Sequence, residues 1–346
     1  MRITNNMLTN NFLSDMQNNL QNMQKIQQQM TSGKLISKAS DDPFIASRSM
    51  QLNSQLGANS QYKSNIKDAS NWLDTTDTTL GQVGNALSRI NELLVSTGDP
   101  GYSNDENQSV KDEINQIISG LSQTLNTNFD GKYIFSGTRS DAKATAAITD
   151  SNGNTQLMYN LPNSTANGVT LTAAQLNQNN KALGMIQQKL STEISQGVTM
   201  DYSVSATDIL QYGSGTSSPS SPTDLKDLLQ SIVNHLDGKN ADGSAPASGA
   251  ASPTSLLTTA DLQGIQDAAN NVLRLRSEVG AKANRMKDAA DSNDAQTQNL
   301  TTILSKTEDI DITQKTMEYA TAQTVYTAAL QTSARVLQPS LLDYLR

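Results

Sequence analysis

The sequence predicts a mainly α-helical, elongated protein: its N- and C-terminal segments pair into a coiled-coil rod, and a β-rich domain is inserted between them. Both ends of the chain carry narrow apolar seams with coiled-coil spacing. Two long segments, 44–99 and 254–338, contain no proline, which suits long helices. Between them, residues 141–253 contain short alternating apolar runs separated by Gly, Ser, Pro and Asn, a pattern typical of strands and turns.

Residues 4–30 form the first predicted helix. Its apolar side chains are separated by steps of three and four, with Gln27 filling one step: Leu13, Met16, Leu20, Met23 and Met30. A seam this narrow cannot bury itself and needs a partner helix. The alternative is a solvent-exposed amphipathic helix on a globular body.

The polar run at residues 32–43 interrupts the helical pattern. Gly33 fits the left-handed position that ends a helix. Asp42 is a good N-cap, and Pro43 suits the first turn of the next helix. The neighbouring pair Asp41 and Asp42 could also act as a general acid and base, but helix capping explains both residues.

Two further helices follow this connector. The first runs from Phe44 to about Val95 and the second from about 106 to 126. The first helix has an apolar face, and the second has an apolar stripe: Ile66, Ala69, Trp72, Leu73 and Leu80, then Val110, Ile114, Ile117, Ile118, Leu121 and Leu125. Asp130-Gly131 is a turn signal before a short β run at 132–135.

In the inserted region, alternating apolar patterns predict strands in the segments TQLMYNL, KLSTEIS and VTMDYSVSATDIL. The same region contains one predicted helix at 223–236. After residue 254, helical patterns resume. Ile303, Ile310 and Met317 are spaced by seven, and Ala322, Val325, Ala329 and Val336 continue the seam. Pro339 ends the last helix. The apolar residues that follow it favour contact with a neighbouring subunit: Leu341, Leu342 and Leu345.

Composition favours an elongated molecule, or one that completes its core with neighbours. Only 36% of the 346 residues are apolar and 4% are aromatic, below the roughly 45–50% apolar share of an ordinary globular domain. A net charge of −8 and a pI near 4.7 argue against nucleic-acid binding. We find no apolar run long enough for membrane insertion and no cleavable signal segment at the N-terminus.

Residue types that perform catalysis or bind metals are scarce. The chain has no cysteine and a single histidine, His235, which we interpret as a surface or capping residue near a helix end. The segment DSNGNT at 150–155 looks like a calcium loop, but its glycine has the wrong offset and no glutamate closes it. We predict a hairpin turn there, and no enzyme activity, cofactor or metal site.

Several segments together resemble the flagellin superfamily of bacterial flagella. They are MRIT at the start, QQQMTSGKLISKASDDP, DGKYIFSGTRSD, and YTAALQTSARVLQPSLLDYLR at the end. The resemblance covers residues 1–140 and 255–346. Filament flagellins usually follow the paired aspartates with Ala-Ala-Gly, whereas Pro43 and Phe44 stand here. This departure and the QPSLLDYLR ending are similar to the hook-associated branch of the superfamily.

The resemblance implies three regions. Residues 1–42 and 306–346 would form an inner coiled-coil domain, residues 43–140 and 254–305 an α-helical rod domain, and residues 141–253 a variable α/β domain. The inner coil would use Leu13, Met16, Leu20, Met23, Met30, Ile310, Met317, Val325 and Val336. Gly33, Asp41, Asp42 and Pro43 would form the connector that lets the chain bend without breaking either helix.

The implied function is mechanical. A protein of this branch would assemble on the first hook-associated protein as a ring of copies of itself, and would join the hook to the flagellin filament. It would leave the cell through the flagellar type III export system without a cleaved signal, held by an export chaperone at its C-terminal region. Its place would be the extracellular flagellum, with no nucleic-acid partner and no membrane insertion.

Three other functions stay open at this point. A filament flagellin would polymerise by itself into long filaments. A secreted coiled-coil effector would bind a host protein. An enzyme housed in residues 141–253 is the third alternative, although no set of residues there supports it.

Overall fold

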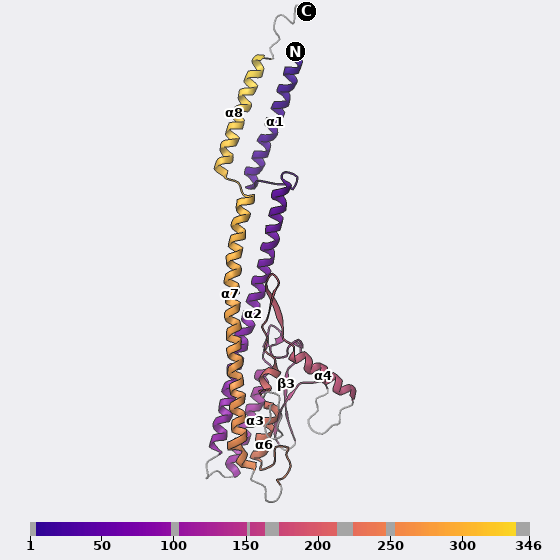
Figure 1. Cartoon of the computed structure of the whole chain (residues 1–346), viewed down its shortest axis with the longest axis vertical. Coiled ribbons are helices and arrows are strands. Elements are labelled where there is room, and N and C mark those ends of the chain that lie inside the picture. Colours follow the sequence, from indigo (N-terminus) through magenta and orange to yellow (C-terminus); the bar gives the residue numbers. More distant parts are fainter. Residues whose placement is uncertain are drawn as a thin grey trace, which may run out of the picture. The chain divides into compact units, whose positions relative to one another are not determined.

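The computed structural model describes residues 5–97, 104–150, 153–162, 173–212, 224–246 and 253–336 (Figure 1). The chain divides into two compact units. One consists of Met1–Gln61 and Asp294–Arg346, and the other of Tyr62–Asn293. The protein is mostly helical, with helices at both ends of the chain and a small sheet-containing region in the middle, as the sequence predicts.

Five long helices dominate the described residues: α1 (Asn5–Ser32), α2 (Pro43–Ser96), α3 (Asn104–Leu125), α7 (Leu262–Glu308) and α8 (Ile312–Val336). The bounds of α2 and α3 confirm the two helices predicted after the connector. The C-terminal helical segment is interrupted once, although it contains no proline to mark the interruption. Residues 309–311 separate α7 from α8, and Asp311 caps α8 by accepting the Thr313 and Gln314 amides at 2.8 and 3.3 Å.

The strands form three antiparallel hairpins within the described ranges. β1 (Asn128–Phe129) pairs with β2 (Lys132–Tyr133), β3 (Thr145–Thr149) with β4 (Thr155–Tyr159), and β5 (Ser191–Ser195) with β6 (Val198–Asp201). Asp130 and Gly131 have φ values of 51° and 78°. Two successive left-handed residues between paired strands are the signature of a type I′ turn, so the predicted turn is confirmed.

Shorter helices complete the middle region: α4 (Ala173–Gln187), α5 (Ala206–Leu210), α6 (Leu225–Leu236), and the 3₁₀ and π turns η1 (Pro253–Leu256) and η2 (Leu257–Asp261). The helix predicted at 223–236 is confirmed as α6. The strand predicted over VTMDYSVSATDIL is wrong in its second half, which forms α5. Ser205 and Asp208 form a capping box there, and that local hydrogen bonding starts a helix.

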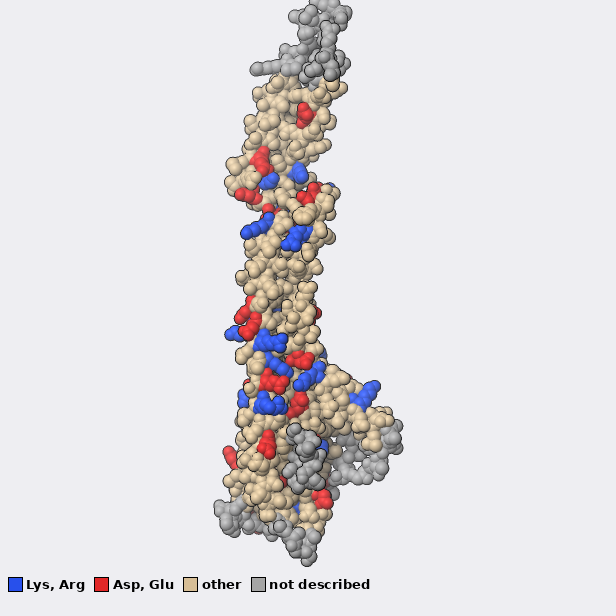
Figure 2. Space-filling model, in the orientation of Figure 1, with Lys and Arg blue, Asp and Glu red and all other residues tan. Residues whose placement is uncertain are grey.

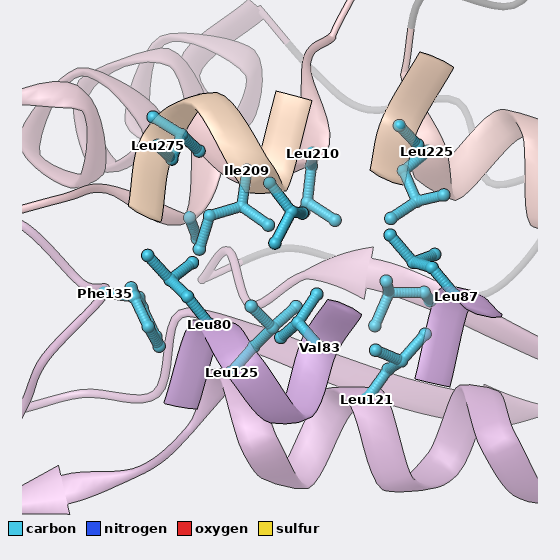
Figure 3. Packing of buried hydrophobic residues seen from close by; sticks show 14 of the residues in the cluster. Leu80, Val83, Leu87, Leu121, Leu125, Phe135, Ile209, Leu210, Leu225 and Leu275 are labelled. Atoms are coloured by element: carbon cyan, nitrogen blue, oxygen red, sulfur yellow. The ribbon is translucent and has the colours of Figure 1, made fainter. Parts of the chain in front are cut away.

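The core lies in the unit of residues 62–293. Figure 3 shows side chains of α2, α3, α5, α6 and α7 pointing toward one another, including Leu80, Leu121 and Ile209. The apolar face predicted on α2 is buried throughout. On α3, Ile117 is half-buried and the other five residues of the predicted stripe are buried. Burial of such faces is the main source of helix stability in a folded protein.

The prediction that His235 is a surface or capping residue is wrong. Its side chain is only 4% exposed, and its Nδ1 atom lies 2.6 Å from Asp261 Oδ2 at the end of the π turn η2. Burial raises the pKa of Asp261, against the opposing effect of the hydrogen bond from His235. Sequence reasoning missed the pairing because the two residues lie on separate elements, α6 and η2.

Candidate functional site: the terminal helix pair and its connector

The helices α1 and α8 lie side by side (Figure 1). Half-buried side chains form one stripe on each helix, again with steps of three and four. On α1 the stripe comprises Phe12, Met16, Asn19, Met23, Ile26 and Met30, and on α8 it comprises Lys315, Tyr319, Ala322, Tyr326 and Ala329. This spacing matches a two-helix coiled-coil seam.

The seam includes some of the residues that the sequence singled out and leaves others outside. Met16, Met23 and Met30 lie on the stripe. Leu13 and Leu20 are 51% and 42% exposed, because the repeat continues through Phe12, Asn19 and Ile26 instead. The sequence analysis assigned a different register because it considered only apolar residues, and one position of the observed stripe is the polar Asn19.

The C-terminal half of the predicted set differs in the same way. Met317 and Val325 are 61% and 53% exposed in the isolated chain. Ile310 lies in the connector between α7 and α8, outside either helix. Val336 is the last residue of α8, and the description does not extend to its side chain. The predicted contact residues Leu341, Leu342 and Leu345 lie outside the described residues.

The helix pair carries few charged side chains. Asp15 and Lys25 are the only charged residues of α1, and most of the surface over α1 and α8 is uncharged on the face drawn in Figure 2. A groove of about 700 Å³ runs along the pair. Amides and the exposed Met317 line it together with three charged residues: Lys25, Lys315 and Glu318. Such a pair leaves apolar and amide groups available for a neighbour.

Two short segments form the connector: residues 33–42 join α1 to α2, and residues 309–311 join α7 to α8. Gly33 has a φ of 71° and ends α1, with its amide donating to the Gln29 carbonyl at 2.8 Å. Lys34 and Asp309 form an isolated antiparallel bridge. The Leu35 amide donates to the Glu308 carbonyl at 2.5 Å, and the Ile310 amide donates to the Gly33 carbonyl at 3.1 Å. Backbone hydrogen bonds therefore join the two segments of the connector directly to each other.

The Glu308 side chain links the two segments of the connector to α2. It is 9% exposed. Its Oε1 atom lies 2.5 Å from Lys34 Nζ, and its Oε2 atom accepts the Ser49 hydroxyl at 3.0 Å. The hydrogen bond to Glu308 raises the pKa of Lys34. Lys34 and Glu308 are 274 residues apart, so no local sequence pattern pairs them.

The two aspartates of the connector have different roles, and only Asp42 caps a helix. Asp41 instead stabilises the turn at residues 37–41, so the prediction that helix capping explains both aspartates is wrong for Asp41. The Asp41 carboxylate accepts the Lys38 and Ser37 amides at 2.9 and 3.2 Å, and these bonds lower the pKa of Asp41. The Asp42 carboxylate accepts the Phe44 and Ile45 amides at 3.0 and 3.1 Å, directly before Pro43 begins α2. Both carboxylates satisfy backbone donors that would otherwise be unpaired.

The described ranges contain neither a metal-binding cluster nor a membrane-spanning helix. No group of three or more His, Cys, Asp or Glu side chains could hold a metal ion in that part of the chain. In the same residues, no helix is long and apolar enough to cross a membrane.

Comparison with known proteins identifies the family. Residues 3–140 match the family model of the bacterial flagellin N-terminal helical region, and residues 262–345 match that of the flagellin C-terminal helical region. The chain belongs to the flagellin family. Each matched segment contains one helix of the terminal pair and one of the two segments of the connector.

Curated relatives include hook-associated proteins and filament proteins. Flagellar hook-associated protein 3 of Salmonella typhimurium is 30% identical over 143 residues, which span 41% of this chain and 45% of that protein. Flagellar hook-associated protein 3 of Escherichia coli is 24% identical, with 83% of this chain and 81% of that protein covered. Flagellin of Bacillus subtilis is 25% identical, with 92% and 90% covered.

Solved structures share the fold. Flagellar hook-associated protein 3 from Legionella pneumophila has a TM-score of 0.55 at 12% identity, and the match covers 74% of this chain and 98% of that one. FlgL from Xanthomonas campestris has a TM-score of 0.51 at 14% identity, with 73% and 99% covered. Because the identities are low, these structures support the fold rather than any shared residue role.

Proposed function

We propose that this flagellin-family protein is a structural adapter of the bacterial flagellum that joins the hook to the filament. The observation that carries the proposal is the terminal helix pair. Its seam is half-buried, and apolar side chains outside the seam remain exposed on both helices. A surface of this kind is completed by other subunits, and the hook-associated relatives favour the junction as the place of assembly.

In this proposal, the seam and the exposed flanks have different tasks. Met16, Met23 and Met30 hold α1 against α8 within one subunit. Leu13, Leu20, Met317 and Val325 contact neighbouring copies, the first hook-associated protein, or flagellin. Leu341, Leu342 and Leu345 serve a subunit or an export chaperone. The protein leaves the cell without a cleaved signal, functions outside it, and catalyses no reaction.

The connector would transmit orientation between the assembled helix pair and the rest of the subunit. Gly33, Asp41, Asp42 and Pro43 shape its N-terminal strand, and Glu308 links that strand to α7 and α2. A joint held by backbone hydrogen bonds and one mostly buried carboxylate keeps both helix ends capped while the chain changes direction.

Deletion of the gene in its flagellated host tests the proposal. Electron microscopy and an assay of flagellin in the medium should show bare hooks with flagellin shed into the medium. Bare hooks without any flagellin would identify the protein as the filament subunit. Intact filaments on the deleted strain would instead support a secreted effector and contradict any assembly role.

A filament flagellin is the second candidate, because the match to Bacillus subtilis flagellin covers 92% of this chain. The two functions differ in polymerisation. Purified protein added to filament seeds should stop after short additions if it is a junction subunit, whereas a filament flagellin should grow long filaments.

A further inference from the structure

A pocket in the unit of residues 62–293 has no assigned role. It measures about 530 Å³, within the range of small-molecule sites. Three separate segments enclose it: α2, the β1–β2 hairpin, and the β5–β6 hairpin with the residue that follows it. The side chains that give it its chemistry are Asp68, Trp72, Phe129, Asp130, Lys132 and Tyr202.

Three aromatic rings line this pocket. Trp72 is 5% exposed, and its ring centroid lies 6.0 Å from that of Phe129 and 5.7 Å from that of Tyr202. The interplanar angles are 83° and 90°, so both half-buried rings stand edge-to-face with the indole. Aromatic faces attract cations because their π systems carry a negative potential above the ring.

The pocket is also acidic at its edge. Asp68 and Asp130 are exposed, and neither forms an ion pair with any residue in the described ranges. The backbone of Asp130 is fixed by the type I′ turn. Burial and the charge of Asp68 both raise the pKa of Tyr202, so the field of this carboxylate reaches the aromatic wall. Against these two carboxylates stands one amine, Lys132, an exposed and flexible side chain that can turn outward.

We propose that this pocket binds an organic cation, a guanidinium or alkylammonium group. The cation would lie against Phe129 and Tyr202 while Asp68 and Asp130 accept its N–H groups. A guanidinium suits the site best, because its planar fork can stack on an aromatic ring and pair with a carboxylate at once. This chemistry does not depend on the proposed flagellar role.

One feature of the pocket favours a different ligand. The Trp72 Nε1–H is buried and has no hydrogen-bond acceptor among the described residues. A neutral sugar could place its apolar face on the rings and, if the side chains around the indole moved, supply a hydroxyl acceptor to that donor. The excess of carboxylates makes us prefer the cation, and the experiment distinguishes the two ligands.

Trp72 makes the test direct, because it is the only tryptophan of the chain. The full-length protein is titrated with L-arginine amide at constant ionic strength while tryptophan fluorescence is recorded. We expect a saturable change with a Kd on the order of millimolar, and no change with N-acetylglucosamine. Asp68→Asn and Asp130→Asn should each weaken binding by about threefold to fivefold, as expected for exposed ion pairs.

The matched control is Asp74→Asn, an exposed carboxylate on the same helix that does not line the pocket. Its affinity for arginine amide should equal that of the unmodified protein. No saturable change with arginine amide, or an equal loss of affinity in the control, overturns the proposal. A response to the sugar alone also overturns it, since the indole N–H would then select the ligand.

The source of the cation needs one additional measurement. If a second copy of the chain supplies it, raising the protein concentration without any probe should reproduce the fluorescence change, and arginine amide should reduce self-association measured by sedimentation velocity. A fluorescence signal that is independent of protein concentration assigns the site to a free cation.

Discussion

Single residues decide the backbone geometry at the sharp turns of this chain. Gly137 has a φ of 58°, and a Cβ atom there would lie 2.4 Å from the Ile186 carbonyl oxygen and 2.5 Å from that of Met185. The next residue, Thr138, donates its amide to Met185 at 3.0 Å. The close approach of two backbones at the end of α4 therefore requires glycine at position 137.

Gly137→Ala should destabilise the protein by about 2 kcal/mol or more, because the added carbon meets backbone atoms that cannot turn aside. The free energy of unfolding in urea measures the effect. Gly120→Ala is the matched control: it lies inside α3 with nothing within 4 Å of the added carbon. It should be neutral or stabilise by up to about 1 kcal/mol. Equal stability of the two variants would contradict the argument.

Glu308 controls the connector through one carboxylate. Glu308→Ala removes the partners of Lys34 and Ser49, whereas Glu308→Gln removes only the charge. We expect amide exchange at Leu35 and Ile310 to accelerate about fivefold in the alanine variant and less in the glutamine variant. Glu318→Ala, which removes a half-buried pair with Lys315 within α8, should leave both amides unchanged.

The same pair gives a pH dependence. Glu308 raises the pKa of Lys34 above its ordinary value of 10.5. A raised pKa means that the pair stabilises the connector fully below pH 10.5 and that this stability is lost as the pH rises through the folded-state pKa. Exchange at Leu35 should therefore accelerate with alkaline pH beyond the intrinsic rate, and Glu308→Gln should abolish that excess.

Among the helices and hairpins, one buried polar network joins three elements. Lys111 of α3 is paired with Asp237, which follows α6, at 2.7 Å, and their side chains are 7% and 14% exposed. The side-chain amide of Asn154, the residue before β4, donates to the other Asp237 carboxylate oxygen at 3.2 Å. The network fixes how α3, α6 and the β3–β4 hairpin pack, and it satisfies charges that burial would otherwise penalise.

Removing Asp237 alone should cost much more than removing both partners of this pair. Asp237→Leu alone should lower the free energy of unfolding by about 3–5 kcal/mol, because it leaves the buried Lys111 without its partner. Lys111→Met alone should cost less, because Asp237 keeps its pair with Lys239 at 3.3 Å and the Asn154 amide at 3.2 Å. The double variant should recover most of that loss. A double-mutant cycle in urea measures the coupling, and additive losses would show that the two side chains act independently.

Acid should weaken the same network. Burial acts to raise the pKa of Asp237, but its hydrogen bonds to Lys111 and Asn154 outweigh burial and hold the pKa below 3.8. A lowered carboxylate pKa means that the stabilisation is present above pH 3.8 and is lost as the pH falls through the folded-state pKa. Acid unfolding curves of Asp237→Asn should lack this part of the pH dependence.

At the scale of the whole molecule, the proposed function assigns two different contacts to α1. The seam residues pair α1 with α8 within one subunit, and the exposed flank contacts other subunits. Met23 is half-buried on the seam between α1 and α8, whereas Leu20 is 42% exposed on its flank. A charge at Met23 has to be buried without a partner or expel α8, whereas a charge at Leu20 stays in water within the isolated chain.

Met23→Asp and Leu20→Asp should therefore fail at different stages. Met23→Asp should unfold the helix pair, detected as a loss of amide protection in α1 and α8, and should be exported but not assembled. Leu20→Asp should keep that protection and still lose assembly. Normal filaments on a strain carrying Met23→Asp would refute the seam, and normal filaments with Leu20→Asp would remove this flank from the proposed contacts.

Most of the helices, the turn at 130–131 and the β3–β4 hairpin could be predicted from the sequence, because they depend on interactions between neighbouring residues. Asp42 and Pro43 start α2 by satisfying local backbone donors, and the apolar stripe on α3 repeats at helical spacing. The resemblance to the flagellin family, carried by linear motifs, was equally accessible and is supported by both family matches.

The tertiary structure decided what depends on residues distant in sequence. The Glu308–Lys34 pair spans 274 residues, and the burial of His235 depends on Asp261 in another element. The seam register passes through polar Asn19 because α8 is the partner, and no pattern within α1 could reveal that. Local hydrogen bonds and periodicity are encoded within a few neighbouring residues, whereas pairing and burial exist only once the chain has brought remote segments together.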